Sequence, residues 1–292
     1  MLGIGRKINL IGGISLKIIE DIKYAFRNAN VAEKIIYINV VLFLVTVLFS
    51  GFVNEWFALP TDFNSFVSKP WTLITYAFIH NGLLHILSNL IILYYIGNLF
   101  LNFFNPKQFI SCYFSGVVFG GIAFLLNYYL TGKTGLPLGG ASAAVSAIFI
   151  AIATKIPRYA LQLRFIGSVE LWVLAAIWIV LSILQLATID NGGAIAHVSG
   201  ALIGYLYASF LNKGLDIGKW TAPIFGSASN LFQQQKKSPL KTVYKSSTKN
   251  FTDEVSKTKQ RKIDDILDKI SKSGYDSLNA EEKEFLFRAG KK

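Results

Sequence analysis

The amino-acid sequence predicts an all-α membrane protein, a bundle of six transmembrane helices followed by a small helical tail. Three observations lead to this fold class. Hydrophobic residues make up 52% of the 292 positions and charged residues only 16%. The apolar residues gather in long runs, and about 20 mostly apolar residues suffice for a helix to cross a bilayer. Lysine and arginine are distributed unevenly between the segments that separate these runs.

Residues 1–34 are predicted to be a cytoplasmic N-terminal segment. Ile14, Ile18, Ile22 and Phe26 recur at every fourth position, with basic residues between them. This spacing is typical of an amphipathic helix that lies in the membrane interface. A partly disordered tail is the alternative.

The membrane domain is predicted to cover residues 35–212. Each of its spans is expected at an apolar run: 35–52, 83–104, 109–130, 142–154, 169–188 and 194–211. The connection between the first two spans contains Trp56 and Trp71. Because tryptophan favours the membrane–water interface, this connection is expected to dip into the headgroup region.

The positions of lysine and arginine predict the orientation. If the N-terminus is cytoplasmic, the outer loops hold only Lys69 and Lys133, and every other lysine and arginine lies on the cytoplasmic side. Such a bias places both termini in the cytoplasm. The net charge of +12 is therefore explained by membrane topology, and no nucleic-acid partner is expected.

The composition changes after the sixth span. Residues 213–261 are rich in Ser, Thr, Lys and Gln and are predicted to be a flexible linker. Residues 262–292 are predicted to form a small cytoplasmic helical hairpin. Its first helix is indicated by an apolar stripe at helical spacing: Ile263, Ile266, Leu267 and Ile270. Gly274 ends this stripe, and Asn279 with Glu282 resembles a capping box that opens a second helix.

Ser142 stands where a nucleophile can be activated. It follows Gly139 and Gly140 and opens a hydrophobic run. Glycine tolerates positive φ, so the pair predicts a turn that delivers Ser142 to the first turn of a helix. The free N–H groups and partial positive charge of a helix N-terminus favour an oxyanion beside the serine. A packing face of small residues is the alternative.

All three histidines lie at or inside predicted spans, where an ionisable side chain is costly and needs a reason. His85 and Asn89 are four residues apart and therefore share one helix face. For each histidine the alternative is a structural hydrogen bond between helices or to a backbone carbonyl.

His197 lies near the start of the sixth span, about one turn before Gly200 and two turns before Gly204. These glycines form a small-residue face that allows close helix packing. If this face packs against the alanines of the fourth span, the His197 imidazole approaches the Ser142 hydroxyl. That is the geometry of a Ser–His pair, in which histidine accepts the proton as serine attacks.

Other membrane mechanisms fit the sequence poorly. It contains no His-Glu-x-x-His motif, no pair of aspartates within the spans and no lysine near Ser142. Three scattered histidines without a carboxylate cluster do not predict a metal site. Neither a metal nor a cofactor is therefore expected.

Together these motifs resemble those of the rhomboid family of intramembrane serine proteases. Gly140-Ala141-Ser142-Ala143 matches the family's Gly-x-Ser-x, and His85 through Asn89 matches His-x-x-x-Asn. Ala196-His197 with Gly200 and Gly204 matches Ala-His-x-x-Gly-x-x-x-Gly. The resemblance covers about residues 35–211 and places the motifs on the second, fourth and sixth spans in the family's order.

The resemblance implies a compact six-helix bundle that cleaves transmembrane protein substrates near the outer membrane face. Ser142 would be the nucleophile and His197 the general base and later acid. The oxyanion hole would be formed by His85, Asn89 and the Ser142 backbone N–H. Two further positions would support the site: His80 and Gly140.

The sequence departs from the family pattern at three positions: Thr72 replaces an arginine, Ala143 a glycine and Leu101 a glutamate. These departures concern loop-anchoring interactions and leave the dyad in place. The hairpin after the bundle resembles an extension of some bacterial members, so we expect an integral protein of the bacterial cytoplasmic (inner) membrane.

Two other function classes remain in view. A catalytically silent relative that binds or escorts membrane proteins would be marked by loss of Ser142 or His197, and both are present. A transporter would predict repeated halves, and the sequence contains no internal repeat. The sequence does not predict the substrate, the role of the hairpin or the oligomeric state.

Overall fold

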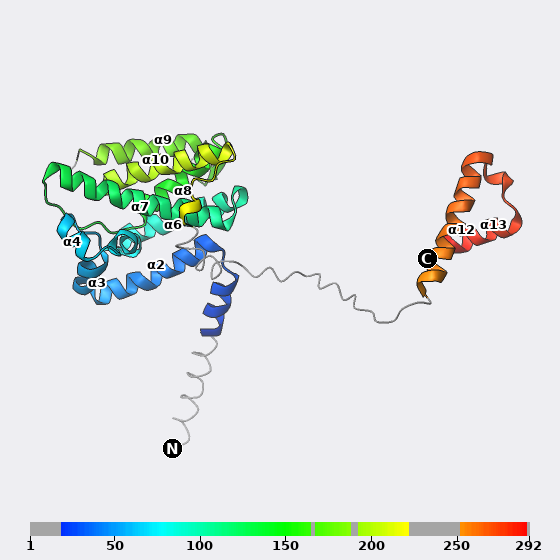
Figure 1. Cartoon of the computed structure of the whole chain (residues 1–292), viewed down its shortest axis with the longest axis horizontal. Helices are drawn as coiled ribbons and strands as arrows, with labels where there is room; N and C mark the ends of the chain where they lie inside the picture. Colours follow the sequence, from blue (N-terminus) through cyan, green and yellow to red (C-terminus); the bar gives the residue numbers. More distant parts are fainter. Residues whose placement is uncertain (1–18, 165–166, 188–191, 222–251, 291–292) are drawn as a thin grey trace, which may run out of the picture. The chain divides into compact units, whose positions relative to one another are not determined.

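A computed structural model describes residues 19–164, 167–187, 192–221 and 252–290 (Figure 1). The chain divides into two compact units, Met1–Gln235 and Lys236–Lys292. Both units are built from helices, apart from one small β-hairpin in the first, so the all-α class is confirmed.

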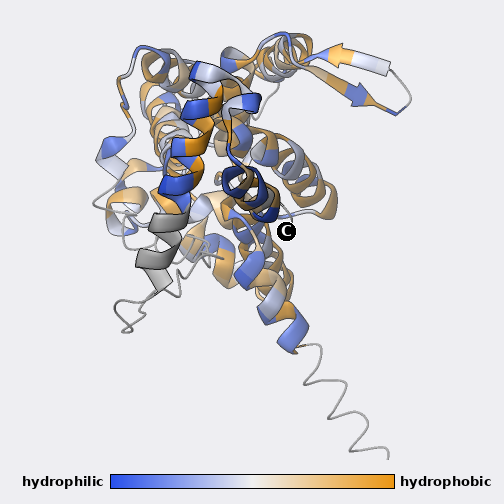
Figure 2. Cartoon of the chain, turned by 90° about the vertical axis from the view of Figure 1, so that its right-hand side faces the viewer, coloured by the Kyte–Doolittle hydropathy of each residue, from blue (hydrophilic) through white to orange (hydrophobic). Residues whose placement is uncertain are grey.

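The first unit is a helical bundle that corresponds to the predicted membrane domain. Its six main helices are α2 (Val31–Leu48), α6 (Leu83–Phe103), α7 (Pro106–Thr131), α8 (Ser142–Lys155), α9 (Leu171–Gln185) and α10 (Gly192–Asn212). Among the described residues, α2, α6, α7 and α10 are long and apolar enough to cross a membrane, whereas α8 and α9 are shorter apolar helices. The chain is therefore an integral membrane protein. Figure 2 shows how widely apolar residues cover these helices.

Two helices begin earlier in the sequence than predicted, because capping residues start them. α2 begins at Val31 because Asn30 and Glu33 cap it reciprocally, with hydrogen bonds of 2.9 and 3.0 Å. The helix therefore starts four residues before the first predicted span, 35–52, while the boundary between residues 34 and 35 stays a prediction. In the same way Asn105 and Gln108 start α7 at Pro106.

The connection between α2 and α6 is folded into short helices: α3 (Ser50–Phe57), α4 (Phe63–Ser68), α5 (Thr72–Thr75) and the 3₁₀ turn η1 (Tyr76–Phe78). The first predicted span, 35–52, ran into α3 because the chain stays apolar across the break after Leu48. A second unpredicted feature lies between α8 and α9. There β1 (Ala160–Leu163) and β2 (Gly167–Glu170) pair as an antiparallel hairpin.

α8 is the centre of the bundle, and its side chains from Ser142 through Ala153 are buried. Glycines of α10 let the two backbones touch. A Cβ at Gly200 would collide with the Ala143 carbonyl, and a Cβ at Gly204 would collide with the Ala147 carbonyl. α7 approaches α8 in the same manner, since a Cβ at Gly120 would lie 2.7 Å from the Ala143 Cβ.

Contacts at one end of the bundle identify helix ends that share a membrane face. Lys155 at the end of α8 donates to Asn212 at the end of α10 over 2.8 Å. Asn30, which caps α2, donates to Asn98 near the end of α6 over 2.6 Å. These ends are the ones that the charge pattern assigns to the cytoplasm.

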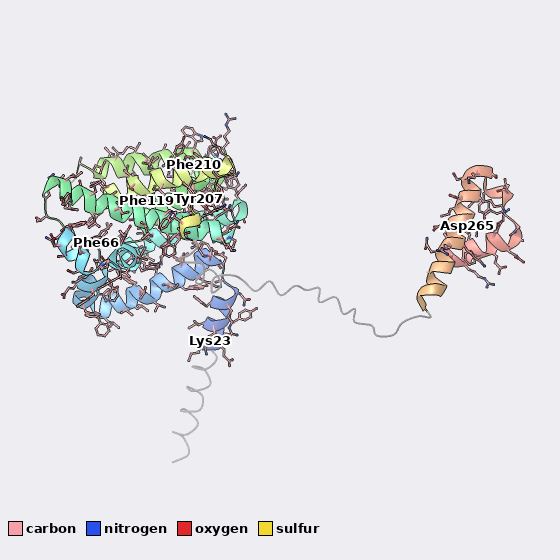
Figure 3. The ribbon with its side chains drawn as sticks, viewed as in Figure 1. Lys23, Phe66, Phe119, Tyr207, Phe210 and Asp265 are labelled. Atoms are coloured by element: carbon pink, nitrogen blue, oxygen red, sulfur yellow. The ribbon has the colours of Figure 1, made fainter. Side chains whose placement is uncertain are left out.

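The chain beyond α10 packs back on the bundle before it leaves the described region. The 3₁₀ turn η2 (Lys219–Thr221) buries Thr221, whose hydroxyl lies 2.8 Å from that of Ser111 on α7. Trp220 meets the Phe119 ring edge-on at 6.3 Å between centroids. Phe119 of α7 and Tyr207 of α10 are labelled in Figure 3. The predicted linker 213–261 therefore begins with ordered structure.

The second unit consists of α12 (Thr252–Ser273), a 3₁₀ turn η3 (Tyr275–Ser277) and α13 (Ala280–Gly290). The predicted capping box is present, with bonds of 2.8 and 2.9 Å between Asn279 and Glu282. Lys269 of α12 donates to the Glu282 carboxylate at 2.9 Å and ties the helices together. α12 begins ten residues before the predicted start at 262, which corrects the end of the predicted linker. Residues 252–261 have no apolar stripe, which is why the sequence did not predict this part of α12. They include residues with high helix propensity, such as Lys, Gln and Arg.

The predicted amphipathic helix at the N-terminus falls partly outside the described residues, including Ile14 and Ile18. Residues 19–28 are helical. Phe26 of this helix meets Tyr37 of α2 at 6.2 Å between ring centroids. Its placement in the membrane interface stays a prediction.

Candidate active site

The turn before Ser142 has the conformation that its glycines predict. Gly140 has φ of +126°, a region that favours glycine, and α8 starts two residues later at Ser142. The Gly140 N–H donates to the Tyr76 carbonyl over 2.9 Å. Leu59 and Leu138 form a two-bond bridge of 2.9 and 2.8 Å just upstream. The turn is thus fastened to the connection between α2 and α6.

The length of α8 sets the depth of Ser142. At about 1.5 Å per residue its 14 residues span roughly 21 Å, whereas the hydrocarbon core is about 30 Å thick. The far end of α8 carries Lys155, level with the end of α10. A helix anchored at that face stops short of the opposite face, so we expect Ser142 to lie several ångströms beneath that opposite membrane surface.

The packing register of α10 on α8 brings His197 level with this turn. Gly200 faces Ala143 and Gly204 faces Ala147, so the two helices run parallel in step. His197 precedes Gly200 by three residues, as Gly140 precedes Ala143. The imidazole is partly exposed at this level, and Ser142 is 9% exposed.

His85 of α6 lies against the same turn. A Cβ at Gly140 would lie 2.7 Å from both Cε1 and Nε2 of the His85 ring and 3.8 Å from Ser142 Oγ. The absence of a side chain at Gly140 therefore makes room for the His85 imidazole beside the serine.

His80 holds the residue before Ser142. Its Nε2 accepts a hydrogen bond of 3.3 Å from the Ala141 N–H, and its ring lies 5.1 Å from that of His85. Nε2 must then be unprotonated. Burial, followed by the nearby His85, lowers the pKa of His80 to about 4 and favours this neutral form. The geometry indicates a structural role.

Two expected contacts are not made. Among the described residues, no hydrogen bond joins Ser142 to His197, although both lie where α8 meets α10. Asn89 donates its amide to the His85 carbonyl of its own helix at 2.8 Å. No hydrogen bond in the described part of the chain links the Asn89 side chain to Ser142, so its oxyanion role stays a prediction.

Two site residues were missed in the sequence. Ser146 on α8 donates to the Ser142 carbonyl over 2.8 Å and accepts from Trp178 Nε1 of α9 over 2.9 Å. The Trp178 ring lies 6.1 Å from the His197 ring at an angle of 32°. Ser146 shares the helix face of Ser142 by its i+4 spacing, which is a usable signal. Nothing in the sequence marks Trp178.

A third missed residue anchors the connection before α6, where Thr72 replaces the family's arginine. Lys69 Nζ donates to the Glu55 carbonyl at 2.9 Å and lies 4.8 Å above the Trp56 ring. Trp56 in turn stacks on Trp71 at 6.3 Å. The loop is thus held by a lysine and two tryptophans.

This arrangement suits acyl transfer. It combines a serine at a helix N-terminus, a histidine level with it on a closely packed helix and a second imidazole beside the serine. Within the described ranges, no group of three or more His, Cys, Asp or Glu side chains has the arrangement of a metal site.

Two family models match the chain. One, described as the Rhomboid domain, matches residues 67–214, half of the chain. The other describes a family of unknown function and matches residues 253–292, which begin within one residue of the start of α12.

Curated relatives are similar to the membrane unit at modest identity. "RHOMBOID-like protein 12, mitochondrial" from Arabidopsis thaliana is 30% identical over 158 residues, 49% of this chain and 47% of the relative. "Rhomboid-like protease 3" from Toxoplasma gondii is 26% identical over 168 residues, 55% of this chain and 59% of the relative. "Presenilin-associated rhomboid-like protein, mitochondrial" from Homo sapiens is 26% identical over 151 residues, which are 49% of this chain and 38% of the relative. The chain thus spans about half the length of these relatives.

Proposed function

The chain belongs to the rhomboid family, and from this premise we propose that it is an intramembrane serine endopeptidase whose nucleophile and base are Ser142 and His197. One observation carries the proposal: His197 lies at the same height along the bundle as the turn before Ser142. The close contact of Gly200 and Gly204 with α8 sets this height.

In the proposed reaction, His197 takes the Ser142 hydroxyl proton as Oγ attacks the scissile carbonyl carbon. The carbonyl oxygen becomes an oxyanion, which the Ser142 N–H at the start of α8 and the His85 imidazole stabilise. His197 then gives the proton to the leaving amine. Water hydrolyses the acyl-enzyme by the same two proton transfers and frees Ser142.

We propose transmembrane proteins as substrates, because the short helix α8 is expected to leave Ser142 beneath the membrane surface. A substrate helix has satisfied its backbone hydrogen bonds, so it must unwind locally before a carbonyl reaches the serine. Small or helix-destabilising residues near the scissile bond favour such unwinding.

The membrane and orientation are proposals as well. The lysine and arginine bias supports cytoplasmic termini. We keep the bacterial cytoplasmic membrane as the proposed location, although the mitochondrial names of two relatives give it no support.

A catalytically silent rhomboid-like protein is the second candidate. The observation that favours it is the missing hydrogen bond between Ser142 and His197. Without substrate, the distance between a catalytic serine and its histidine is often longer than an ideal hydrogen bond. The missing bond is therefore weaker evidence than the presence of Ser142, His197 and His85 around the same turn.

The deciding experiment treats the detergent-solubilised protein with a fluorophosphonate and measures its intact mass. We expect one adduct on wild type and none on Ser142→Ala or His197→Ala, because the serine needs its base. Cleavage of a transmembrane substrate should be abolished in both variants. Asn89→Ala should cost less, on the order of 10–1,000-fold by analogy with other oxyanion donors.

Circular dichroism and thermal unfolding of each variant provide the control for folding. A folded wild-type protein that takes no adduct and cleaves nothing would favour the silent relative. Cleavage by Ser142→Ala at the wild-type rate would exclude the proposed nucleophile.

A further inference from the structure

The proposed base lacks the partner that usually orients such a histidine. In a serine-protease triad, a carboxylate holds the imidazole in one tautomer and orientation. The helices α6, α8, α9 and α10 contain no aspartate or glutamate. No hydrogen bond within the described residues holds the His197 ring, and the titratable side chain beside it is His85. Packing against neighbouring side chains is then the remaining means of orienting the imidazole.

The Trp178 indole packs beside the His197 imidazole. Its ring centroid lies 6.1 Å from that of His197, and the planes are tilted by 32°. A rigid bicyclic ring at this distance forms a wall on the α9 side of the imidazole.

Two contacts on α8 fix the indole itself. Its Nε1–H donates to Ser146 Oγ over 2.9 Å, and the Phe149 ring meets it at 5.9 Å with an interplanar angle of 70°. Ser146 has no exposed surface, so water cannot replace the indole as its donor.

The same serine reaches the residue that carries the nucleophile. Ser146 Oγ donates to the Ser142 carbonyl over 2.8 Å while it accepts from Trp178. A single hydroxyl thus links the wall beside the base to the first turn of α8.

We propose that Trp178, anchored by Ser146, is a positioning residue that keeps the His197 imidazole turned toward Ser142. This role rests on the proposed Ser142–His197 chemistry and supplies the orientation that a carboxylate would provide. Trp178 does not exchange protons with the substrate and acts through His197.

The test compares Trp178→Leu, which removes the ring, Trp178→Phe, which keeps a ring without the N–H, and Ser146→Ala, which removes the anchor. Trp172→Phe is the matched control, because Trp172 lies on the same helix, is 53% exposed and donates to Glu170. Each full-length protein is assayed in detergent on a transmembrane peptide substrate for kcat, KM and the pH profile of kcat. Fluorophosphonate adduct at saturation counts the active serines.

We expect Trp178→Leu to lower kcat per active serine by about 100-fold, the cost of a misplaced catalytic group, with KM unchanged. Trp178→Phe and Ser146→Ala should lose less, and all three should shift the acidic limb of the pH profile. The Trp172→Phe control should match wild type in each measurement.

A purely structural role predicts a different result, in which fewer serines are titrated while kcat per active serine and the pH profile stay at wild-type values. That result would overturn the proposal. Ser146→Ala keeps the test decisive if Trp178→Leu does not fold, since it removes one oxygen atom. Failure of wild type itself to react with the fluorophosphonate would instead reject the proposed function.

Discussion

The hydrogen bond from the Ala141 N–H to His80 Nε2 helps to hold the residue before Ser142 in place. The neutral imidazole accepts it, and protonation of Nε2 would remove the acceptor. Burial and the neighbouring His85 lower the pKa of His80 to about 4, whereas an unfolded histidine has a pKa of about 6.5. The folded state therefore binds fewer protons between these values. The stability gained is complete above about pH 6.5 and is lost as the pH falls toward 4.

We expect this linkage to appear in thermal unfolding. The apparent Tm of wild type in detergent should fall between about pH 7 and about pH 5 more steeply than that of His80→Gln. The glutamine side-chain oxygen can accept from Ala141 but does not titrate. Parallel pH dependences of the two proteins would contradict the assignment.

The residues of the site divide into those that short motifs reveal and those that they do not. Ser142, His85 and His197 each belong to a local pattern of glycine, serine or histidine, so spacing alone singles them out. Trp178 and Lys69 act across the chain, one on a neighbouring helix and one on a loop tryptophan. Their importance arises from packing, which a single sequence does not encode locally.

At the scale of helices, the contact of α10 with α8 positions the proposed base. Gly200 and Gly204 allow backbone contact, and even one methyl group at either position would collide with a carbonyl of α8. Gly193 on the same helix has nothing within 4 Å of an added Cβ. The two kinds of glycine therefore offer a matched comparison.

Gly200→Ala should destabilise the bundle by about 1–3 kcal/mol, because overpacking forces the helices apart. It should also reduce cleavage, since His197 would move away from Ser142. Gly193→Ala should leave both properties near wild type. Thermal unfolding and the substrate assay measure the two effects, and equal results for the two variants would argue against the helix contact described here.

Hydropathy predicted the membrane helices well because burial and lipid exposure both select apolar residues. Helix ends were less predictable. The charged Lys34 set the predicted start of the first span at residue 35, yet in the structure it is 3% exposed and its ammonium lies 5.8 Å from the Phe26 ring. The β1–β2 hairpin was missed because each strand has only four residues, although Leu161-Gln162-Leu163 alternates between apolar and polar. The first turns of α12 were missed because they lack an apolar stripe.

At the scale of the whole chain, the distribution of lysine and arginine predicts the orientation in the membrane, which the fold alone does not. It assigns the α7–α8 loop to the outside and the second unit to the inside. The native Cys112 is buried and should not react with a bulky reagent. Single cysteines placed in exposed segments can therefore report the orientation.

In intact expressing cells, a membrane-impermeant maleimide should label Thr134→Cys and leave Ser277→Cys unlabelled. Both positions are exposed, so access to the cysteine decides the result. Ser277→Cys should react once the membrane is permeabilised, and wild type should stay unlabelled throughout. The reverse pattern would place the termini outside and refute the orientation.

The contact between Trp178 and His197 also makes the site visible to light. Indole emission is quenched by a protonated imidazole nearby, and these rings lie 6.1 Å apart. In a variant that keeps this tryptophan and replaces the other four, fluorescence would follow the charge of the proposed base directly. The Trp178 ring, which packs beside His197, would then report the protonation of that histidine by its fluorescence during turnover.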